Sequence, residues 1–176
     1  MKARGFTLAE LAFVTALAAL VAGALIARVV PLLGRAERVQ YLKTEAELRS
    51  ALLLEAATRI ARGDSTTLIE LSRSNPIDLL PAPPSDYVGQ AAWTETTQIP
   101  RPSWHFDAAR GTLVYRVGPH TSFEAVDGPA DTIELAVVFR FDDRNANGVF
   151  EPGIDTFHRL DLAPLNAYLW PERGAL

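Results

Sequence analysis

The stretch Gly5-Phe6-Thr7-Leu8-Ala9-Glu10-Leu11 opens an apolar run that continues to Ile26. Lys2 and Arg4 precede the stretch, and the run that follows it contains neither a charged residue nor a proline. Glu10 stands at the front edge of this run, where a carboxylate is costly if the segment enters lipid. The stretch therefore predicts an apolar N-terminal helix in which the carboxylate of Glu10 has a specific role.

Three interpretations fit this start. A secretory signal peptide has a basic start, an apolar core and a small-residue cleavage site such as Ala22 to Ala24, but here the helical pattern continues past Ile26. A plain membrane anchor also fits, because Phe6 to Ala27 is long enough to cross about 30 Å of hydrocarbon. The third interpretation is a class III signal, which we follow. The residues that match it, with Ala9 at the variable place, are Gly5, Phe6, Thr7, Leu8 and Glu10.

This motif, ahead of a long apolar helix, resembles the type IV pilin and pseudopilin family. The resemblance implies that a prepilin peptidase removes residues 1–5 by cutting between Gly5 and Phe6, and that the new amine of Phe6 is methylated. In a fibre, Glu10 would pair with the amine of a neighbouring subunit, because either charge is expensive to bury alone. Within one chain, Glu10 would cap its own helix N-terminus or reach the membrane interface.

The resemblance also implies partners and a location. The partners are the peptidase, other pilin or pseudopilin subunits and an inner-membrane assembly platform. The protein would cross the bacterial inner membrane once with its head in the periplasm, and would then join a periplasmic pseudopilus or a surface pilus.

The N-terminal helix is expected to form a long stem. Residues 6–30 are its membrane and assembly half, and residues 31–63 are an amphipathic half that packs on a globular head. Pro31 and Gly34 predict a bend or local loosening, and Gly63 predicts the end of the helix. The positions that recur near helical spacing in the second half, and so define the predicted packing face, are Val39, Leu42, Ala46, Arg49, Leu53, Ala56 or Ala57, and Ile60.

The rest of the chain predicts a connector and a sheet. Residues 64–102 predict a short helix, capped by Asp64 or Ser65, and a Pro-rich connector. Residues 103–176 alternate with period two, which predicts strands around Trp104 to Phe106, Leu113 to Val117, Thr132 to Phe141 and Phe157 to Leu162. The expected fold class is α+β, with a long N-terminal helix packed against a small antiparallel β-sheet head, as in pilin-like proteins.

Residues 142–155 carry oxygen-bearing side chains at alternate positions, and Gly148 follows where a calcium loop turns sharply. Calcium takes six to eight oxygen ligands. The predicted ligands are Asp143, Asn145, Asn147, the carbonyl of Val149, Glu151 and Asp155. The segment resembles the first half of an EF-hand or dockerin loop, but its twelfth position is Ile154 rather than Glu. A polar hairpin loop is the alternative. The chain has no Cys, and some pseudopilins use calcium to hold this region.

Composition and motif content exclude some classes of function. A net charge of −4 argues against a nucleic-acid-binding body. We expect no enzyme, because no histidine belongs to a metal or nucleophile spacing; His105 and His158 are expected at solvent or sheet-edge positions and His120 in a loop. We expect a structural subunit of a type IV pilin-like fibre, and within that class we favour a pseudopilin of a type II secretion-type system. The alternatives are a minor pilin for adhesion or DNA uptake and a membrane-anchored periplasmic binding domain that does not polymerise.

Overall fold

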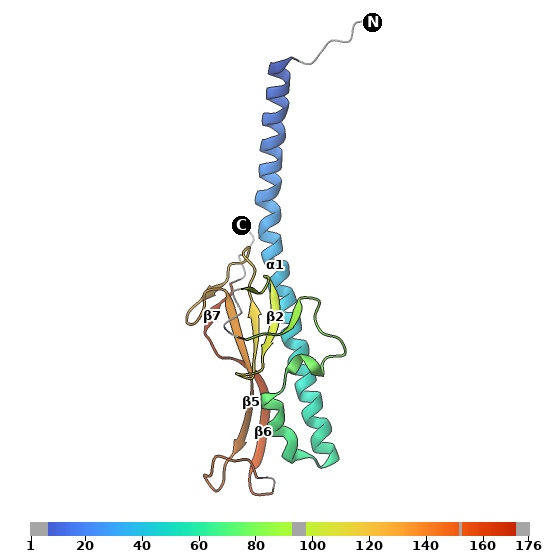
Figure 1. The fold of residues 1–176 in the computed structure, drawn as a ribbon, viewed down its shortest axis with the longest axis vertical. Helices are drawn as coiled ribbons and strands as arrows, with labels where there is room; N and C mark the ends of the chain where they lie inside the picture. The colour runs from blue at the N-terminus through green and yellow to red at the C-terminus, as the bar shows by residue number, and fades with distance from the viewer. Residues whose placement is uncertain (1–6, 93–97, 152, 172–176) are drawn as a thin grey trace.

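The stem is one continuous helix in the computed structural model, which describes residues 7–92, 98–151 and 153–171. Helix α1 spans Leu8–Arg62, 55 residues or about 82 Å. It ends at Gly63, whose φ of 82° closes the helix in the left-handed region that glycine adopts at little cost. Figure 1 shows the N-terminal half projecting away from the head, while the C-terminal half lies against the sheet. The predicted stem and its C-terminal stop are confirmed.

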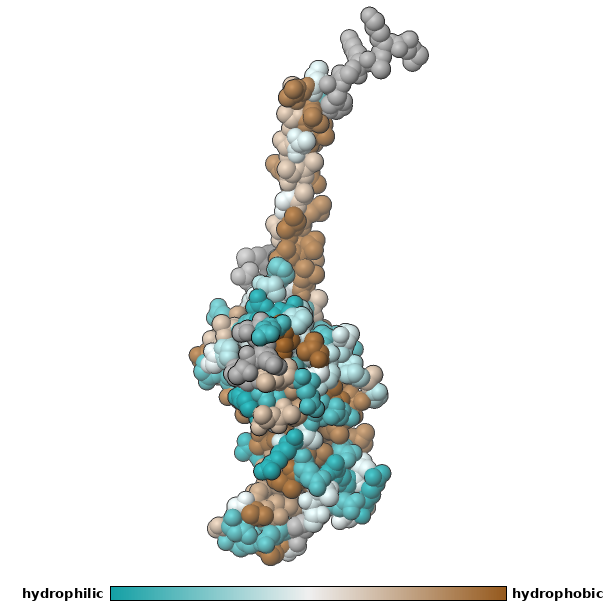
Figure 2. Space-filling model, in the orientation of Figure 1, coloured by the Kyte–Doolittle hydropathy of each residue, from teal (hydrophilic) through white to brown (hydrophobic). Residues whose placement is uncertain are grey.

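The projecting half of α1 has the length and composition of a membrane span. Its apolar side chains are exposed along the whole segment, as the predominantly brown surface in Figure 2 shows. Exposed aliphatic side chains in such a continuous run need an apolar surrounding. Lipid is the surrounding that the length of the segment matches, so the helix is compatible with a single-pass anchor.

The helix continues through Pro31 and Gly34 without interruption. Gly34 is buried, and a Cβ added there would overlap the carbonyl oxygen of His120. The absence of a side chain at Gly34 therefore lets the backbone of the head approach the stem closely. The role of Gly34 in this structure is to permit this close approach of stem and head.

The connector differs from the predicted short helix. Two 3₁₀-helices follow the stem: η1 spans Ser65–Arg73 and η2 spans Pro76–Leu79. Asp64 occupies the N-cap position of η1 but makes no side-chain capping hydrogen bond, so the predicted Asp64 cap is wrong. Instead, its backbone carbonyl accepts hydrogen bonds from both the N–H and the hydroxyl of Thr67, at 3.0 and 2.8 Å. These contacts join residues three apart, which is 3₁₀ geometry.

The head contains a five-stranded sheet in the order β1-β2-β3-β5-β6. Its strands are β1 (Tyr87–Gln90), β2 (Ser103–Asp107), β3 (Thr112–Arg116), β5 (Thr132–Asp142) and β6 (Thr156–Pro164). The strands β2, β3, β5 and β6 pair with one another in antiparallel fashion, but β1 pairs with β2 in parallel. The sheet is therefore mixed, and the prediction of a purely antiparallel sheet is wrong at this edge. A crossover from β1 to β2 makes the parallel pairing possible.

A second, two-stranded sheet pairs β4 (Glu124–Ala125) with β7 (Tyr168–Leu169). The α+β class, with a long N-terminal helix packed on a small sheet, is confirmed. The sequence did not indicate β1, β4 or β7, because strands of two to four residues offer too little alternation.

The stem uses a different face against the head from the one that the sequence suggested. The buried positions of its second half are Tyr41, Thr44, Leu48, Leu52 and Ala56. Tyr41 stacks on Trp104 with ring centroids 5.4 Å apart, and Leu48 and Leu52 join the same core as Leu113, Ile133 and Leu135. Ala56 is buried as predicted, but most of the other predicted positions lie on another face and are exposed, with Val39 at 64% and Leu53 at 68%. The second half of α1 therefore has two apolar faces.

The five-stranded sheet is covered on both of its faces at β2 and β3. Every residue of β2 and β3 is buried, on both faces. The face away from the stem is polar: Arg116 pairs with Asp131 at 2.8 Å, and Arg110 pairs with Glu134 at 2.6 Å. His105 lies fully buried on this face, so the prediction of a solvent or edge position for it is wrong. His158 is half-exposed and lies 2.9 Å from Asp142.

Candidate functional site

Glu10 belongs to a capping box at the start of α1. Thr7 is the N-cap, and its hydroxyl oxygen accepts a hydrogen bond from the Glu10 N–H at 3.3 Å. In return, Oε2 of Glu10 accepts hydrogen bonds from the N–H and the hydroxyl of Thr7, both at 3.0 Å. This reciprocal arrangement satisfies helix N–H groups that otherwise have no partner. The expectation that Glu10 caps its own helix is confirmed.

The capping box leaves half of the carboxylate available. Both contacts from Thr7 go to Oε2, and Oε1 accepts no hydrogen bond from the residues that the structure describes. The side chain is fully exposed at the tip of the projecting helix. Gly5 and Phe6, the predicted processing residues, lie outside the described residues. Glu10 is thus positioned to accept from another group while it caps its own helix.

The loop between β5 and β6 brings four of the predicted ligand residues together. The two carboxylate oxygens of Asp143 accept the N–H groups of Asn147 and Gly148 at 3.1 and 2.6 Å. The side-chain amides of Asn145 and Asn147 both donate to Oε2 of Glu151, at 2.5 and 3.1 Å. Gly148 has a φ of 75°, the left-handed conformation that the turn requires.

Asp155 closes the base of this loop. One of its carboxylate oxygens accepts the N–H of Arg144 at 3.0 Å, and the other accepts the N–H of Glu151 at 2.7 Å. The predicted ligand Val149 has an exposed side chain, and its N–H donates to the side-chain oxygen of Asn147 at 2.8 Å. Asp155 therefore holds the two ends of the loop together.

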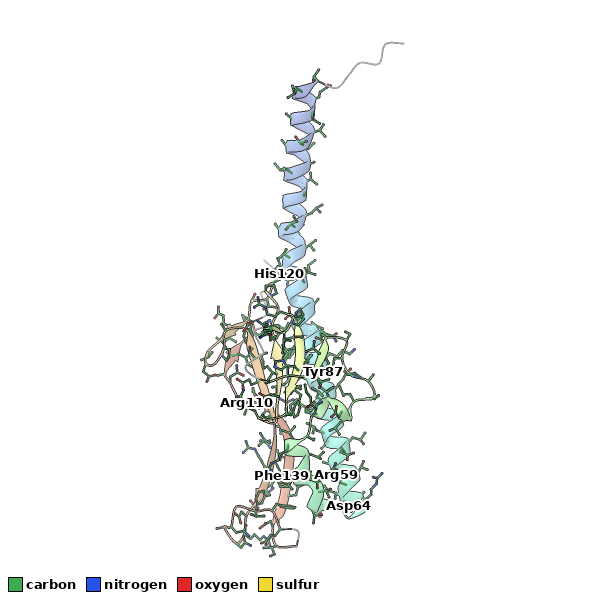
Figure 3. The ribbon with its side chains drawn as sticks, viewed as in Figure 1. Arg59, Asp64, Tyr87, Arg110, His120 and Phe139 are labelled. Atoms are coloured by element: carbon green, nitrogen blue, oxygen red, sulfur yellow. The ribbon has the colours of Figure 1, made fainter. Side chains whose placement is uncertain are left out.

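An aromatic cluster anchors the loop to the strands. Phe150 contacts Phe139 and Phe141 edge-on, with ring centroids 5.1 and 5.5 Å apart. Phe139 also packs against Phe157 of β6. Figure 3 shows Phe139 near the end of the head that lies away from the projecting helix. The loop is thus a structured tip held by its own side chains.

The donor set of the loop limits the metal that it suits. Among the described residues, no three side chains of Asp, Glu or His converge as a metal-binding group. A cation here would need the amide oxygens of Asn145 and Asn147, backbone carbonyls and water in addition to carboxylates. Hard oxygen ligands of this kind suit calcium, and the amides would have to turn their oxygens inward. The residues present are compatible with calcium on these terms.

Glu37 joins the stem to the end of the head that lies nearest the projecting half of α1. Its Oε1 accepts the hydroxyl of Tyr115 at 3.2 Å and the N–H of Gly118 at 2.7 Å. Burial raises the pKa of Glu37, and the charge of Asp86 acts in the same direction; the two hydrogen bonds and His120 oppose them without cancelling the shift. In Figure 3, His120 lies at this end of the head. The contact fixes the head to the stem where the stem leaves the apolar segment.

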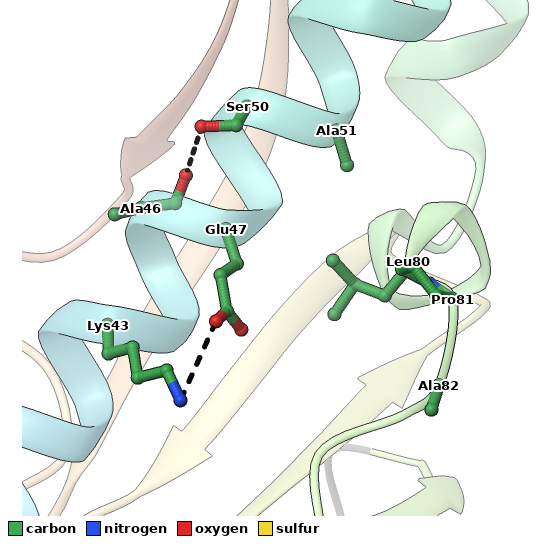
Figure 4. Close-up of a pocket in the computed structure, with 8 residues that line it drawn as sticks. All are labelled: Lys43, Ala46, Glu47, Ser50, Ala51, Leu80, Pro81 and Ala82. Carbon is green, nitrogen blue, oxygen red and sulfur yellow. Dashed lines mark hydrogen bonds and ion pairs between the residues drawn. The ribbon is translucent and has the colours of Figure 1, made fainter.

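A shallow groove of about 650 Å³ lies between the stem and the Pro-rich connector (Figure 4). Its polar side chains interact within the stem. The hydroxyl of Ser50 donates to the carbonyl of Ala46 at 2.8 Å, and Nζ of Lys43 lies 3.8 Å from Oε1 of Glu47. The remaining lining is apolar and comes from Ala46, Ala51, Leu80, Pro81 and Ala82. The polar side chains that line the groove thus contact one another or the backbone of the stem, and they do not form the convergent polar set that is typical of small-molecule sites.

Comparisons of the chain with protein-family models, with curated proteins and with solved structures found no match. The geometry of the described residues therefore carries the functional argument.

Sequence reasoning anticipated the cap by Glu10, but it missed the partner of Glu10 in that cap and the contact of Glu37 with the head. The pairing of Thr7 with Glu10 was visible as a Thr-x-x-Glu pattern ahead of an apolar run, which indicates a capping box. The stem–head contact of Glu37 had no local signal, because its partners Tyr115 and Gly118 lie about 80 residues away in the chain.

Proposed function

We propose that the protein is a structural subunit of a type IV pilin-like fibre, above all a pseudopilin of a type II secretion-type system. In this proposal a prepilin peptidase cuts between Gly5 and Phe6. The processed chain stays in the inner membrane with its head in the periplasm until an assembly platform adds it to a fibre. Other subunits of the fibre are its partners, and the protein catalyses no reaction.

One observation supports this proposal above the others: an exposed acid at the tip of a long, uncovered apolar helix. A plain anchor gains from Glu10 only the cap of its own helix, at the cost of a carboxylate next to lipid. A fibre subunit gains a counter-charge, since the amine of a processed neighbour can neutralise Glu10. The Oε1 atom, which accepts no hydrogen bond from the described residues, fits that role.

Substitution of Glu10 tests the proposal. We expect Glu10→Ala to remain in the membrane but to be lost from sheared or extracted fibres. Thr7→Ala is the matched control, because it removes the N-cap side chain and keeps the acid. If Glu10 serves only its own helix, both variants would show the same defect, and a fibre role would be excluded; processing of each variant is checked by mass.

We also propose that the loop of residues 142–155 binds calcium, with ligands from Asp143, Asn145, Asn147, Glu151 and the Val149 carbonyl, while Asp155 closes the loop. Ligand binding to the folded state alone stabilises it by about 2.7 kcal/mol at 100 times the Kd. For a chain of this size, this amounts to a rise in Tm of about 5–10 °C.

The calcium proposal is tested by thermal unfolding of the full chain in detergent, with millimolar calcium or with a chelator. We expect calcium to raise the Tm of the native chain and of the control Asp142→Ala, whose side chain pairs with His158. Asp143→Ala is expected to lose the response. An equal Tm with calcium and with chelator for the native chain would remove the site and leave a polar hairpin loop.

A further inference from the structure

The apolar half of α1 carries two opposite charges on one face. Between Leu8 and Val30, Glu10 and Arg28 are the charged residues. Arg28 follows Glu10 by 18 residues, which is about five helical turns and about 27 Å along the axis. The two side chains therefore project from the same side of the helix. Arg28 is exposed and forms no hydrogen bond or ion pair with the residues that the structure describes.

Past Arg35, which lies on the same line, this side of the helix continues as an uncovered apolar stripe beside the head. We call the exposed residues Val39, Leu42, Ala46, Leu53 and Ile60 the outer stripe. Ala46 follows Arg28 by a further 18 residues, so the outer stripe prolongs the line that Glu10 and Arg28 begin. Its members are three, four or seven residues apart, the spacing of a seam between two helices.

Lipid does not suit the outer stripe. The exposed ion pair of Lys43 and Glu47 borders it, and the head surrounds the opposite side of the helix. The occupant must be an apolar helix that also brings an acid to Arg28. The first half of α1 from a second copy of this chain has both properties.

We propose that adjacent copies of α1 pack side by side with an axial offset of about 18 residues, so that Glu10 of one copy pairs with Arg28 of the next. This inference rests on the proposed fibre and specifies its register. The offset also places Val21 and Ala24 of one copy against Val39 and Leu42 of its neighbour. Each copy offers its Glu10 to one neighbour and its Arg28 to another, so the contact repeats without closing, as a fibre requires.

The pairing is compatible with the capping box and with the Phe6 amine. Oε2 of Glu10 is held by Thr7, and Oε1 remains for groups from other copies. In this register the charge of Glu10 is neutralised by Arg28, and the Phe6 amine of another copy adds a hydrogen bond to Oε1 but no second neutralisation, because one carboxylate balances one cation.

The register is tested by cysteine cross-linking of the full chain, which has no Cys of its own, in cells that assemble the fibre. The double variant Val21→Cys with Val39→Cys is expected to give a ladder of cross-linked multimers. Val21→Cys with Leu53→Cys controls for a different offset, and Val39→Cys alone controls for helices in register. All three positions are exposed, so the fold is preserved.

Charge variants test the pair in the Val21→Cys, Val39→Cys background. Arg28→Glu is expected to reduce the ladder about tenfold or more, as loss of a buried ion pair does, whereas Arg28→Lys keeps it. Glu10→Lys combined with Arg28→Glu is expected to restore it. Fibres that cross-link at another offset, or a ladder unaffected by Arg28→Glu, would overturn this inference and leave the proposed function intact. A membrane-inserted, folded chain that forms no fibre and no cross-link at any offset would overturn both.

Discussion

At the scale of single residues, Glu37 shows how the stem is held to the head. Its carboxylate is half-buried, because Tyr115 and Gly118 of the head bind it from one side. Burial raises its pKa above the ordinary value of 4.5. The folded state therefore binds more protons than the unfolded state between that value and the raised one. The contribution of Glu37 to stability is greatest at low pH and falls as pH rises through the folded-state pKa.

We expect the free energy of unfolding to fall less steeply between pH 4.5 and neutrality in Glu37→Gln than in the native chain. Gln keeps an acceptor for the Gly118 N–H but cannot ionise. Denaturant unfolding at a series of pH values measures the slope. Part of the slope remains in the variant, because burial also raises the pKa of Asp86. Glu47→Gln on the exposed side of the stem is the control, and identical slopes for Glu37→Gln and the native chain would contradict the account.

His105 shows where reasoning from single residues fails. The alternation of β2 placed Trp104 and Phe106 in the core and so assigned His105 to solvent. In the structure both faces of β2 are buried, and His105 is covered as completely as Trp104. Alternation identifies one buried face, but it does not reveal that a second face is also covered.

At the scale of elements, the period-two pattern predicted the four longest strands and the hairpin of β2 and β3 correctly. The packing face of the stem was not predictable in the same way. Its second half has one apolar line through Tyr41, Leu48 and Leu52 and another along the outer stripe. Helical periodicity supports both lines equally. The aromatic surface that Trp104 and Tyr115 offer to Tyr41 selects the first.

Two leucines on these faces give a matched pair of variants. Leu48 is fully buried in the core, and Leu53 is 68% exposed on the outer stripe. We expect Leu48→Ala to lower the free energy of unfolding by about 2–5 kcal/mol, through lost burial and a cavity. Leu53→Ala is expected to change it by about 0.5 kcal/mol or less. Chemical denaturation of the detergent-solubilised chain measures both, and equal losses would place the head on the wrong face of the stem.

The loop of residues 142–155 illustrates what a sequence motif can and cannot predict about an element. Alternating Asp143, Asn145 and Asn147 with Gly148 correctly indicated a tight turn, and the structure gathers these side chains around Glu151. The motif did not show which of these side chains hold the loop together. Asp155 uses both oxygens on backbone N–H groups, a role that depends on where β6 begins rather than on local spacing.

At the scale of the whole molecule, the α+β architecture followed from the order of patterns along the chain. A long apolar helix precedes an amphipathic continuation and then period-two segments, and such an order has few packed solutions. The parallel pairing of β1 did not follow, because it depends on a crossover through the connector. Within the part of the chain that the structure describes, the projecting half of α1 and the outer stripe remain uncovered.

The mass of the mature N-terminus, measured on protein extracted from the native membrane, tests the central claim most directly. The account predicts a chain that begins at Phe6, with its amine methylated. Protein that retains residues 1–5, or that begins well beyond Phe6, would contradict it.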